Sequence, residues 1–338
     1  MAILDVNNMS KVYSNDAGIK NIDLHIEKHG IYGLLGTNGA GKSTFMNVVT
    51  GYIGATSGNV CVSGKDVFKD ADEAKTMIGY LPELPPVYND MTVREYLLFA
   101  AELKKLSKAS RKAAVGEVME LTKVADVADR LIKNLSKGYK QRVGLAQAIL
   151  GYPELIILDE PSVGLDPEQI IELRELITSL KEKHTVILSS HILSEVQEIC
   201  DYVYIIDKGK LIAANTIEGL AESLNNNQVI ELTVKGDGQS ALSLLSQIDD
   251  VEKVEIIKTN DDGTVDLKVN VSSGNDIREK VSVTLAASSM AIYSMKVNEQ
   301  SLENIFLELT QNAEVSDNNA IEPDAEDSES DNANEEEE

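Results

Sequence analysis

The sequence contains no tryptophan, only four phenylalanines and only two cysteines in 338 residues. With so few aromatic rings, the core must be filled mainly by aliphatic side chains. The two cysteines, Cys61 and Cys200, lack paired metal-ligand spacing, and so few cysteines favour a reduced, cytoplasmic setting over a disulfide framework. No apolar run reaches the 18 or so residues of a membrane span, and the first residues lack a basic region followed by an apolar segment. We therefore expect a chain that is soluble or peripheral.

Basic charge is also scarce, with 31 Lys or Arg against 56 Asp or Glu and a net charge of −25. This excess argues against electrostatic binding of nucleic acid. Twelve of the acidic residues lie in 314–338, where no Lys or Arg occurs, so 313–338 is predicted to be a disordered tail. The tail either solubilises the protein or serves as an interaction arm. One basic patch, Lys104 to Ala114, is interpreted as a solvated helix face, with contact to a membrane protein or anionic lipid as the alternative.

A glycine-rich stretch, GTNGAGKST, lies between an apolar run at 31–35 and a helix-forming run at 43–50. It satisfies G-x-x-x-x-G-K-[ST], in which backbone N–H groups and a helix N-terminus surround phosphate groups. The alternative is a glycine-rich strand-to-helix turn that binds nothing. Lys42 is expected to reach the β and γ phosphates of ATP, and Ser43 to bind Mg²⁺. The stretch assigns to the nucleotide Gly36, Thr37, Asn38, Gly39, Ala40, Gly41, Lys42, Ser43 and Thr44.

Two further motifs follow in order, LSKGYKQR at 135–142 and LIILDEP at 155–161. Asp-Glu after an apolar strand is common by itself, and such a pair is often a solvated strand end. Together with the phosphate loop, however, the three motifs resemble the ABC ATPase family of P-loop NTPases. The resemblance implies that Asp159 holds Mg²⁺ and that Glu160 polarises the attacking water. It also implies that Ser136 and Gly138 bind the nucleotide of a partner subunit, so that a head-to-tail homodimer, or a heterodimer, buries two ATP molecules.

Other positions of the sequence also resemble the ABC ATPase family. Tyr13 stands where the family stacks an aromatic ring on adenine, although ordinary packing is the alternative. Asp166 lies in the loop that crosses between subunits, and Pro167 is expected to begin a helix. His191 resembles the switch histidine that contacts the γ phosphate. The resemblance thus assigns catalytic roles to Glu160, His191, Lys42 and Glu83, and metal contacts to Ser43, Glu83 and Asp159.

Glu83 departs from the common pattern, because most family members have Gln at this position. A carboxylate there adds negative charge beside the metal and is expected to raise metal affinity or to bond a metal-bound water. The surrounding GYLPE, 79–83, resembles a subset of ATPases that serve drug, polysaccharide, sodium and gliding-related exporters.

The order of patterns predicts two folded units. The first, 1–218, is expected to be an α/β ABC ATPase core: a mostly parallel sheet, an antiparallel β subdomain and a helical insert at about 84–145. Within the insert, Thr92 and Glu95 predict a capping box. The second unit, 219–312, has β-α-β-β-α-β order, which predicts a small α+β ferredoxin-like domain followed by a helix at 301–310. It is either a packing or dimer-supporting appendage or a ligand sensor.

Three functions remain to be weighed. The chain is interpreted as the ATPase subunit of a transporter, with export favoured over import. It is expected to act with a membrane-spanning permease and to be peripheral to the cytoplasmic face of the membrane. A soluble ABC ATPase acting on ribosomes or DNA is the alternative, yet such proteins carry two cassettes or a long coiled coil. A kinase or other phosphate-loop enzyme would leave LSKGYKQR unexplained. No nucleic-acid partner is expected.

Overall fold

The computed structural model describes residues 2–14, 17–223, 228–271 and 276–298, together with Phe306 and Thr310. The predicted acidic tail and, apart from those two residues, the predicted helix 301–310 lie outside the described residues. No helix among the described residues is long and apolar enough to cross a lipid bilayer.

A six-stranded sheet forms the centre of the first unit, in the order β10-β9-β3-β8-β7-β6. Every neighbouring pair from β9 to β6 is parallel, and β10 adds an antiparallel edge. The inner strands β7 and β8 are buried at every residue, which explains why they read as continuous aliphatic runs. The strands are β3 (Gly30–Leu35), β6 (Ile78–Leu81), β7 (Leu155–Asp159), β8 (Thr185–Ser190), β9 (Tyr202–Asp207) and β10 (Lys210–Asn215).

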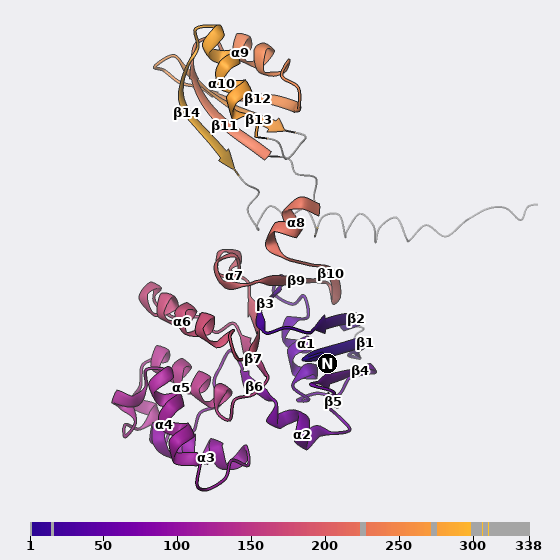
Figure 1. The fold of residues 1–338 in the computed structure, drawn as a ribbon, viewed down its shortest axis with the longest axis vertical. Helices are drawn as coiled ribbons and strands as arrows, with labels where there is room; N and C mark the ends of the chain where they lie inside the picture. Colours follow the sequence, from indigo (N-terminus) through magenta and orange to yellow (C-terminus); the bar gives the residue numbers. More distant parts are fainter. Residues whose placement is uncertain are drawn as a thin grey trace, which may run out of the picture.

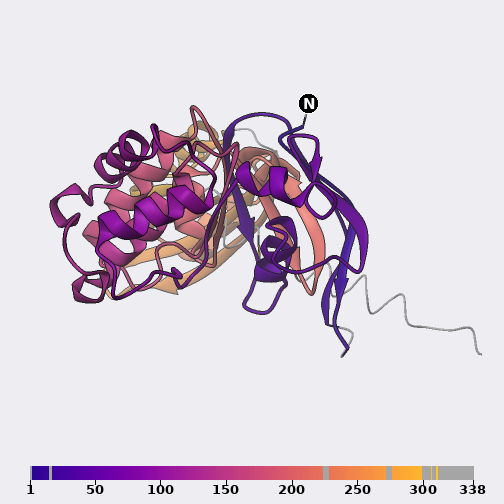
Figure 2. The same cartoon turned by 90° about the horizontal axis from the view of Figure 1, so that it is seen from below.

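A second, antiparallel sheet lies on one side of this centre, in the order β2-β1-β4-β5 (Figures 1 and 2). Its apolar face and the central sheet enclose α1, whose Phe45 and Met46 are fully buried. The elements here are β1 (Leu4–Val12), β2 (Gly18–Ile26), α1 (Lys42–Val49), β4 (Ser57–Val62), β5 (Lys65–Asp66) and α2 (Ala71–Thr76). The phosphate-loop helix is therefore fixed between two sheets.

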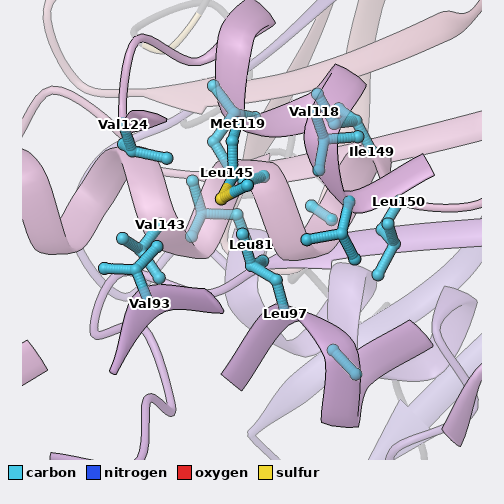
Figure 3. Close-up of a cluster of buried hydrophobic side chains, with 14 of the residues drawn as sticks. Leu81, Val93, Leu97, Val118, Met119, Val124, Val143, Leu145, Ile149 and Leu150 are labelled. Carbon is cyan, nitrogen blue, oxygen red and sulfur yellow. The ribbon is translucent and has the colours of Figure 1, made fainter. Parts of the chain in front are cut away.

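Helices of the predicted insert lie on the other side of the central sheet (Figures 1 and 2). They are α3 (Val93–Leu103), α4 (Arg111–Leu121), the 3₁₀ turns η1 (Ala125–Val127) and η2 (Ile132–Asn134), and α5 (Lys137–Ile149). Figure 3 shows aliphatic side chains of α3, α4 and α5 meeting around Leu145 and Leu81. The predicted end of the insert near residue 145 falls inside α5, which continues to Ile149 because Ala146, Ala148 and Ile149 remain buried.

The remaining helices of this unit are α6 (Pro167–Leu180), α7 (Leu193–Ile199) and α8 (Ile217–Ser223). Pro167 occupies the first turn of α6 as expected, with Asp166 as its N-cap. A small apolar cluster joins Leu35 of β3, Val196 of α7 and Leu220 of α8. This cluster packs α7 and α8 against the central sheet, where the chain leaves the first unit.

The C-terminal unit contains the six elements in the order that the sequence predicts. They are β11 (Gln228–Lys235), α9 (Gly238–Leu245), β12 (Val251–Thr259), β13 (Thr264–Val271), α10 (Arg278–Ala287) and β14 (Ala291–Asn298). All three strand pairs are antiparallel, in the sheet order β12-β13-β11-β14. Helices α9 and α10 contribute Leu245 and Val281 to an aliphatic core of its own. In Figure 1 this unit lies beyond α8, at the opposite end of the molecule from α3.

Candidate active site

The phosphate loop leaves the carboxyl end of β3 and enters α1 directly. Gly41 is the N-cap of α1 and has φ +115°, a conformation that side chains rarely adopt. A Cβ atom at Gly36 would stand 2.4 Å from the carbonyl oxygen of Ile206, so only glycine permits this approach to β9. The two glycines therefore shape the loop, and the N-terminus of α1 faces the space that the loop surrounds.

Lys42 is held inside the loop by main-chain oxygens. Its Nζ donates to the carbonyl oxygen of Gly36 at 2.7 Å and to that of Thr37 at 3.2 Å. Burial lowers the pKa of Lys42, and this outweighs the nearby carboxylates Glu160 and Asp159, which raise it. The ammonium lies 3.9 Å from Oε1 of Glu160. The phosphate loop thus holds a buried cation through its own carbonyl oxygens.

A cleft of about 210 Å³ opens beside this ammonium. It combines the phosphate loop with three carboxylates, which reach it from the ends of two neighbouring strands, β6 and β7. The lining residues are Thr37, Asn38, Gly39, Gly41, Lys42, Ser43, Thr44, Glu83, Asp159 and Glu160. Gly36 and Ala40 of the predicted set are buried behind this lining. The structure therefore brings together the phosphate-binding and the acidic residues that the sequence placed 40 to 120 positions apart.

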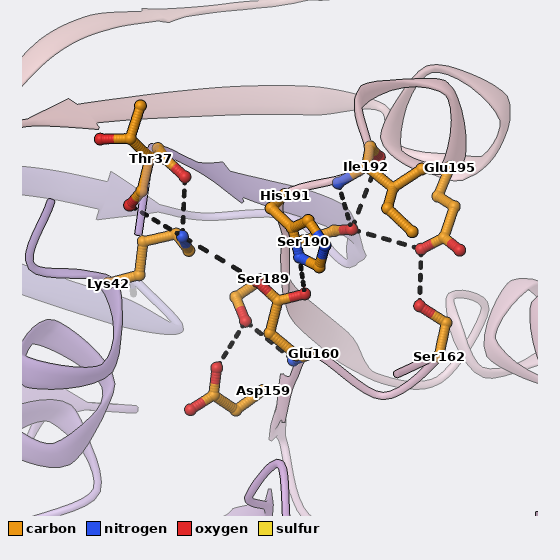
Figure 4. A network of polar contacts seen from close by, with 11 residues as sticks. Thr37, Lys42, Asp159, Glu160, Ser162, Ser189, Ser190, His191, Ile192 and Glu195 are labelled. Atoms are coloured by element: carbon orange, nitrogen blue, oxygen red, sulfur yellow. Dashed lines mark hydrogen bonds and ion pairs between the residues drawn. The ribbon is translucent and has the colours of Figure 1, made fainter. Parts of the chain in front are cut away.

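The two adjacent carboxylates diverge because β7 ends between them. Asp159 is the last residue of the strand, whereas Glu160 has φ +47° and turns the chain out of the sheet. Ser189, at the end of the neighbouring strand β8, fixes both: its Oγ donates to Asp159 Oδ1 at 2.7 Å and accepts from the N–H of Glu160 at 2.9 Å (Figure 4). The end of the strand thus points the two adjacent carboxylates in different directions.

His191, which the sequence singled out by its place after β8, contacts Glu160 directly. Its Nδ1 lies 2.7 Å from Oε2 of Glu160, and because a carboxylate only accepts, this nitrogen carries the proton. The imidazole is half-exposed while Glu160 is 12% exposed. This hydrogen bond fixes the orientation of the Glu160 carboxylate.

Sequence reasoning missed the serines and the buried glutamate behind these groups. Ser189 and Ser190 end β8, and Glu195 lies in the first turn of α7. The available signal was the position of two hydroxyls at the carboxyl end of a strand next to β7, where the strand ends of a parallel sheet meet.

A family model described as ABC transporter matches residues 19–163. The linearmycin resistance ATP-binding protein LnrL of Bacillus subtilis (strain 168) is 34% identical over 313 residues, covering 91% of this chain and 98% of that relative. The chain belongs to the ABC transporter ATP-binding proteins. The bacitracin transport ATP-binding protein BcrA of Bacillus licheniformis is 35% identical over 309 residues, with 91% and 97% covered.

Solved structures agree with this membership. A structure described as the ATP-binding subunit of an ABC transporter has a TM-score of 0.61 at 28% identity and covers 66% of this chain and 93% of its own. CbiO1 from Clostridium perfringens, described as part of the ABC transporter complex CbiONQ, gives 0.58 at 26% identity, with 67% and 95% covered. The predicted ABC ATPase fold is confirmed, and the chain is an ATP-hydrolysing subunit of an ABC transporter.

His191 reaches Glu160 but is not part of the cleft lining, and four further predicted residues of this ABC ATPase also lie outside that lining. Ser136 is the N-cap of α5 and accepts from the N–H of Tyr139, and a Cβ at Gly138 would stand 2.3 Å from Oε1 of Gln169. Asp166 caps α6 by accepting from the N–H of Gln169 at 2.9 Å. Tyr13 is 44% exposed just after β1, with the ammonium of Lys11 5.5 Å from its ring centre. None of these four residues lines the cleft beside Lys42.

Proposed function

We propose that this ABC ATPase binds Mg·ATP in the cleft beside Lys42 and hydrolyses it with Glu160 as the group that polarises water. The observation that carries the proposal is the convergence of one buried ammonium and three carboxylates on the phosphate loop. In this proposal Lys42 shifts its hydrogen bonds from the loop carbonyls to the β and γ phosphates. His191 holds Glu160 through Nδ1 and contacts the γ phosphate through its other ring nitrogen, while Thr44 lies beside the α phosphate.

The donor set suits magnesium. Ser43 supplies a hydroxyl, and Asp159 and Glu83 supply carboxylates, which are the hard oxygen ligands that Mg²⁺ prefers. A bound Mg²⁺ would neutralise part of the phosphate charge. Glu83 gives this site one more negative charge than the Gln of most relatives would, so we expect a higher affinity for divalent cations.

We further propose that a second copy of the chain completes each site. Ser136, Gly138 and the N-terminus of α5 form an anion-binding surface that has no triphosphate to meet within its own chain. In a head-to-tail homodimer this surface faces the γ phosphate held by the partner, with Asp166 in the loop beside it. Tyr13 stacks on adenine at the outer side of the phosphate loop. Two ATP molecules then lie between the two copies.

The transport partner is proposed to be a separate membrane-spanning permease, with the ATPase peripheral to the cytoplasmic face of the membrane. Export is supported by the GYLPE sequence and by relatives whose names specify linearmycin resistance and bacitracin transport. Those relatives match this chain over 91% of its length, including most of the C-terminal unit.

Replacing Glu160 by Gln tests the hydrolytic role. We expect the Glu160→Gln variant to hydrolyse ATP about 10² to 10³ times more slowly, because the amide no longer attracts a proton from water. ATP-bound dimers should accumulate, which size-exclusion chromatography with light scattering would detect at saturating ATP. The matched control is Glu154→Gln, which changes an exposed carboxylate just before β7.

The control should match the unsubstituted protein in turnover and in association state. Wild-type turnover in the Glu160→Gln variant would remove Glu160 from the proposed mechanism. If the chain stayed monomeric with ATP in that variant, while Ser136→Ala left turnover unchanged, the proposed dimer would be wrong.

A further inference from the structure

A buried carboxylate outside the cleft connects the two loops that carry Glu160 and His191. Oε2 of Glu195 accepts from the hydroxyl of Ser162 at 2.7 Å and from that of Ser190 at 3.2 Å (Figure 4). Ser162 follows Glu160 by two residues, and Ser190 directly precedes His191. One oxygen atom of α7 therefore joins the end of the β7 loop to the end of β8.

The hydrogen bonds of Glu195 to the two serines are shielded from solvent. Ser162, Ser190 and Glu195 are exposed by 6%, 0% and 6%, so water cannot easily replace a lost partner. The other oxygen of Glu195, Oε1, lies 4.0 Å from the guanidinium of Arg174 on α6. That guanidinium also pairs with Glu198, one turn further along α7. A buried carboxylate with two hydroxyl donors and a cationic neighbour is held in one position.

The two serines lie in the turns that hold Glu160 and His191, so fixing the serines also fixes these two residues. Ser190 also accepts from the N–H of Ile192 at 3.0 Å, which closes the turn that contains His191. On the other side, Val163 donates its N–H to the carbonyl oxygen of Glu160 at 3.2 Å, so Ser162 lies inside a turn that begins at Glu160. Moving Glu195 would release both turns at once. The 2.7 Å contact between His191 and Glu160 would then lose its support.

We propose that Glu195 is a positioning residue for ATP hydrolysis, which clamps the loop after Glu160 to the loop of His191 through the hydroxyls of Ser162 and Ser190. The inference rests on the roles proposed above for Glu160 and His191. Glu195 touches neither nucleotide nor water in this assignment. It acts only through the geometry of the pair, and a misplacement of about 1 Å in such a pair costs up to about 100-fold in rate.

The principal variant is Glu195→Ala, for which we expect kcat to fall about 10-fold while KM and ATP affinity remain within about twofold. Glu195→Gln should restore part of the rate, because its amide oxygen can still accept from the serines. The matched control is Glu198→Ala, which removes a carboxylate from the same helix and the same arginine without touching either serine. It should keep the full rate.

The Glu160→Gln background distinguishes a positioning role of Glu195 from a purely structural one. If Glu195 acts through the Glu160–His191 pair, adding Glu195→Ala to Glu160→Gln should change single-turnover hydrolysis by less than about twofold, because the positioned group is already gone. A general loss of packing would instead lower the rate as much as in the native background. Thermal melting and binding of a fluorescent ATP analogue, measured on the same samples, report folding and nucleotide affinity.

Ser162→Ala provides a second route if Glu195→Ala does not fold, since it removes one hydroxyl and no charge. A lower kcat with unchanged ATP affinity in this variant supports the clamp. Full turnover in Ser162→Ala and in whichever Glu195 variant folds would overturn it, as would an undiminished effect in the Glu160→Gln background. Wild-type turnover in Glu160→Gln alone would instead contradict the proposed function, so the two failures are distinguishable.

Discussion

At the residue scale, Lys104 belongs to the basic patch 104–114, yet its ammonium group makes hydrogen bonds inside the protein. The sequence favoured a solvated helix face for 104–114. In the structure, Nζ of Lys104 donates to the carbonyl oxygens of Ala148 and Leu150 at 2.9 and 2.8 Å. These carbonyls lie at the C-terminal end of α5, where a cation satisfies unpaired oxygens and the negative end of the helix dipole. Lys104 therefore connects the end of α3 to the end of α5.

A pH-dependent contribution to stability follows from this burial. Burial lowers the pKa of Lys104 to about 8, against an ordinary value of 10.5. Between these two values the unfolded chain binds more protons than the folded one, so stability rises with pH in that window. Relative to Lys104→Met, the unsubstituted protein should gain up to about 3 kcal/mol between pH 8 and 10.5, measured by urea unfolding.

The control for this prediction is Lys105→Met, which removes the neighbouring ammonium, 66% exposed and paired with Asp72. Its stability difference from the unsubstituted protein should stay constant from pH 8 to 10.5. A constant difference for Lys104→Met as well would show that Lys104 keeps its charge throughout this range.

At the element scale, helix α3 begins with the capping box that its sequence predicts. Thr92 Oγ1 accepts from the N–H of Glu95, and the Glu95 carboxylate accepts from the N–H of Thr92 at 2.9 Å. Both residues lie within one helical turn, so the capping box can be predicted from a short stretch of sequence. The start of α6 at Pro167 was predictable for the same reason.

We expect Thr92→Ala to lower the free energy of unfolding by about 1 kcal/mol, since the N–H of Glu95 in the first turn loses its side-chain acceptor. Denaturant unfolding followed by circular dichroism would measure the change. Ser110→Ala is the control, because Ser110 precedes α4 but makes no side-chain cap bond to that helix. A loss in Thr92→Ala no larger than in Ser110→Ala would mean that tertiary packing alone holds the start of α3.

Sequence reasoning could not supply the contacts that side chains make with partners far away in the chain. The phosphate loop, the acidic strand end and the ferredoxin-like order of elements follow from local patterns of glycine, apolar residues and turns. The contact of Ser189 with Asp159 spans 30 residues, and that of Lys104 with Ala148 spans 44. Serine and lysine are mostly exposed in proteins, so their burial here depends on which strand ends and helix ends the fold brings together.

At the scale of the whole molecule, the C-terminal unit has the features of an independently packed body. Its aliphatic core is separate from those of the ATPase unit. Across the sheet, Glu255 pairs in register with Lys268, Lys268 with Glu231, and Glu231 with Lys296. Such a row of alternating charge stabilises neighbouring strands and keeps that face compatible with water.

One described residue beyond β14 connects the chain back to the ATPase unit. Phe306 is half-buried against the cluster that contains Leu35, Val196 and Leu220. Because Val196 lies on α7 next to Glu195, this ring packs against the cluster that supports the helix carrying Glu195. We expect Phe306→Ala to lower the melting temperature of the ATPase unit by about 2–6 °C, which corresponds to about 1–2 kcal/mol for a partly buried ring.

Two truncations separate this contact from the rest of the C-terminal sequence. A chain that ends at residue 298 should melt as early as Phe306→Ala, since both lose the same ring. A chain that ends at residue 312 keeps Phe306 and loses the acidic segment, so it should melt with the full-length protein. Scanning calorimetry without nucleotide would compare all four proteins. If the chain ending at 312 melted as early as the one ending at 298, the acidic segment rather than Phe306 would stabilise the ATPase unit.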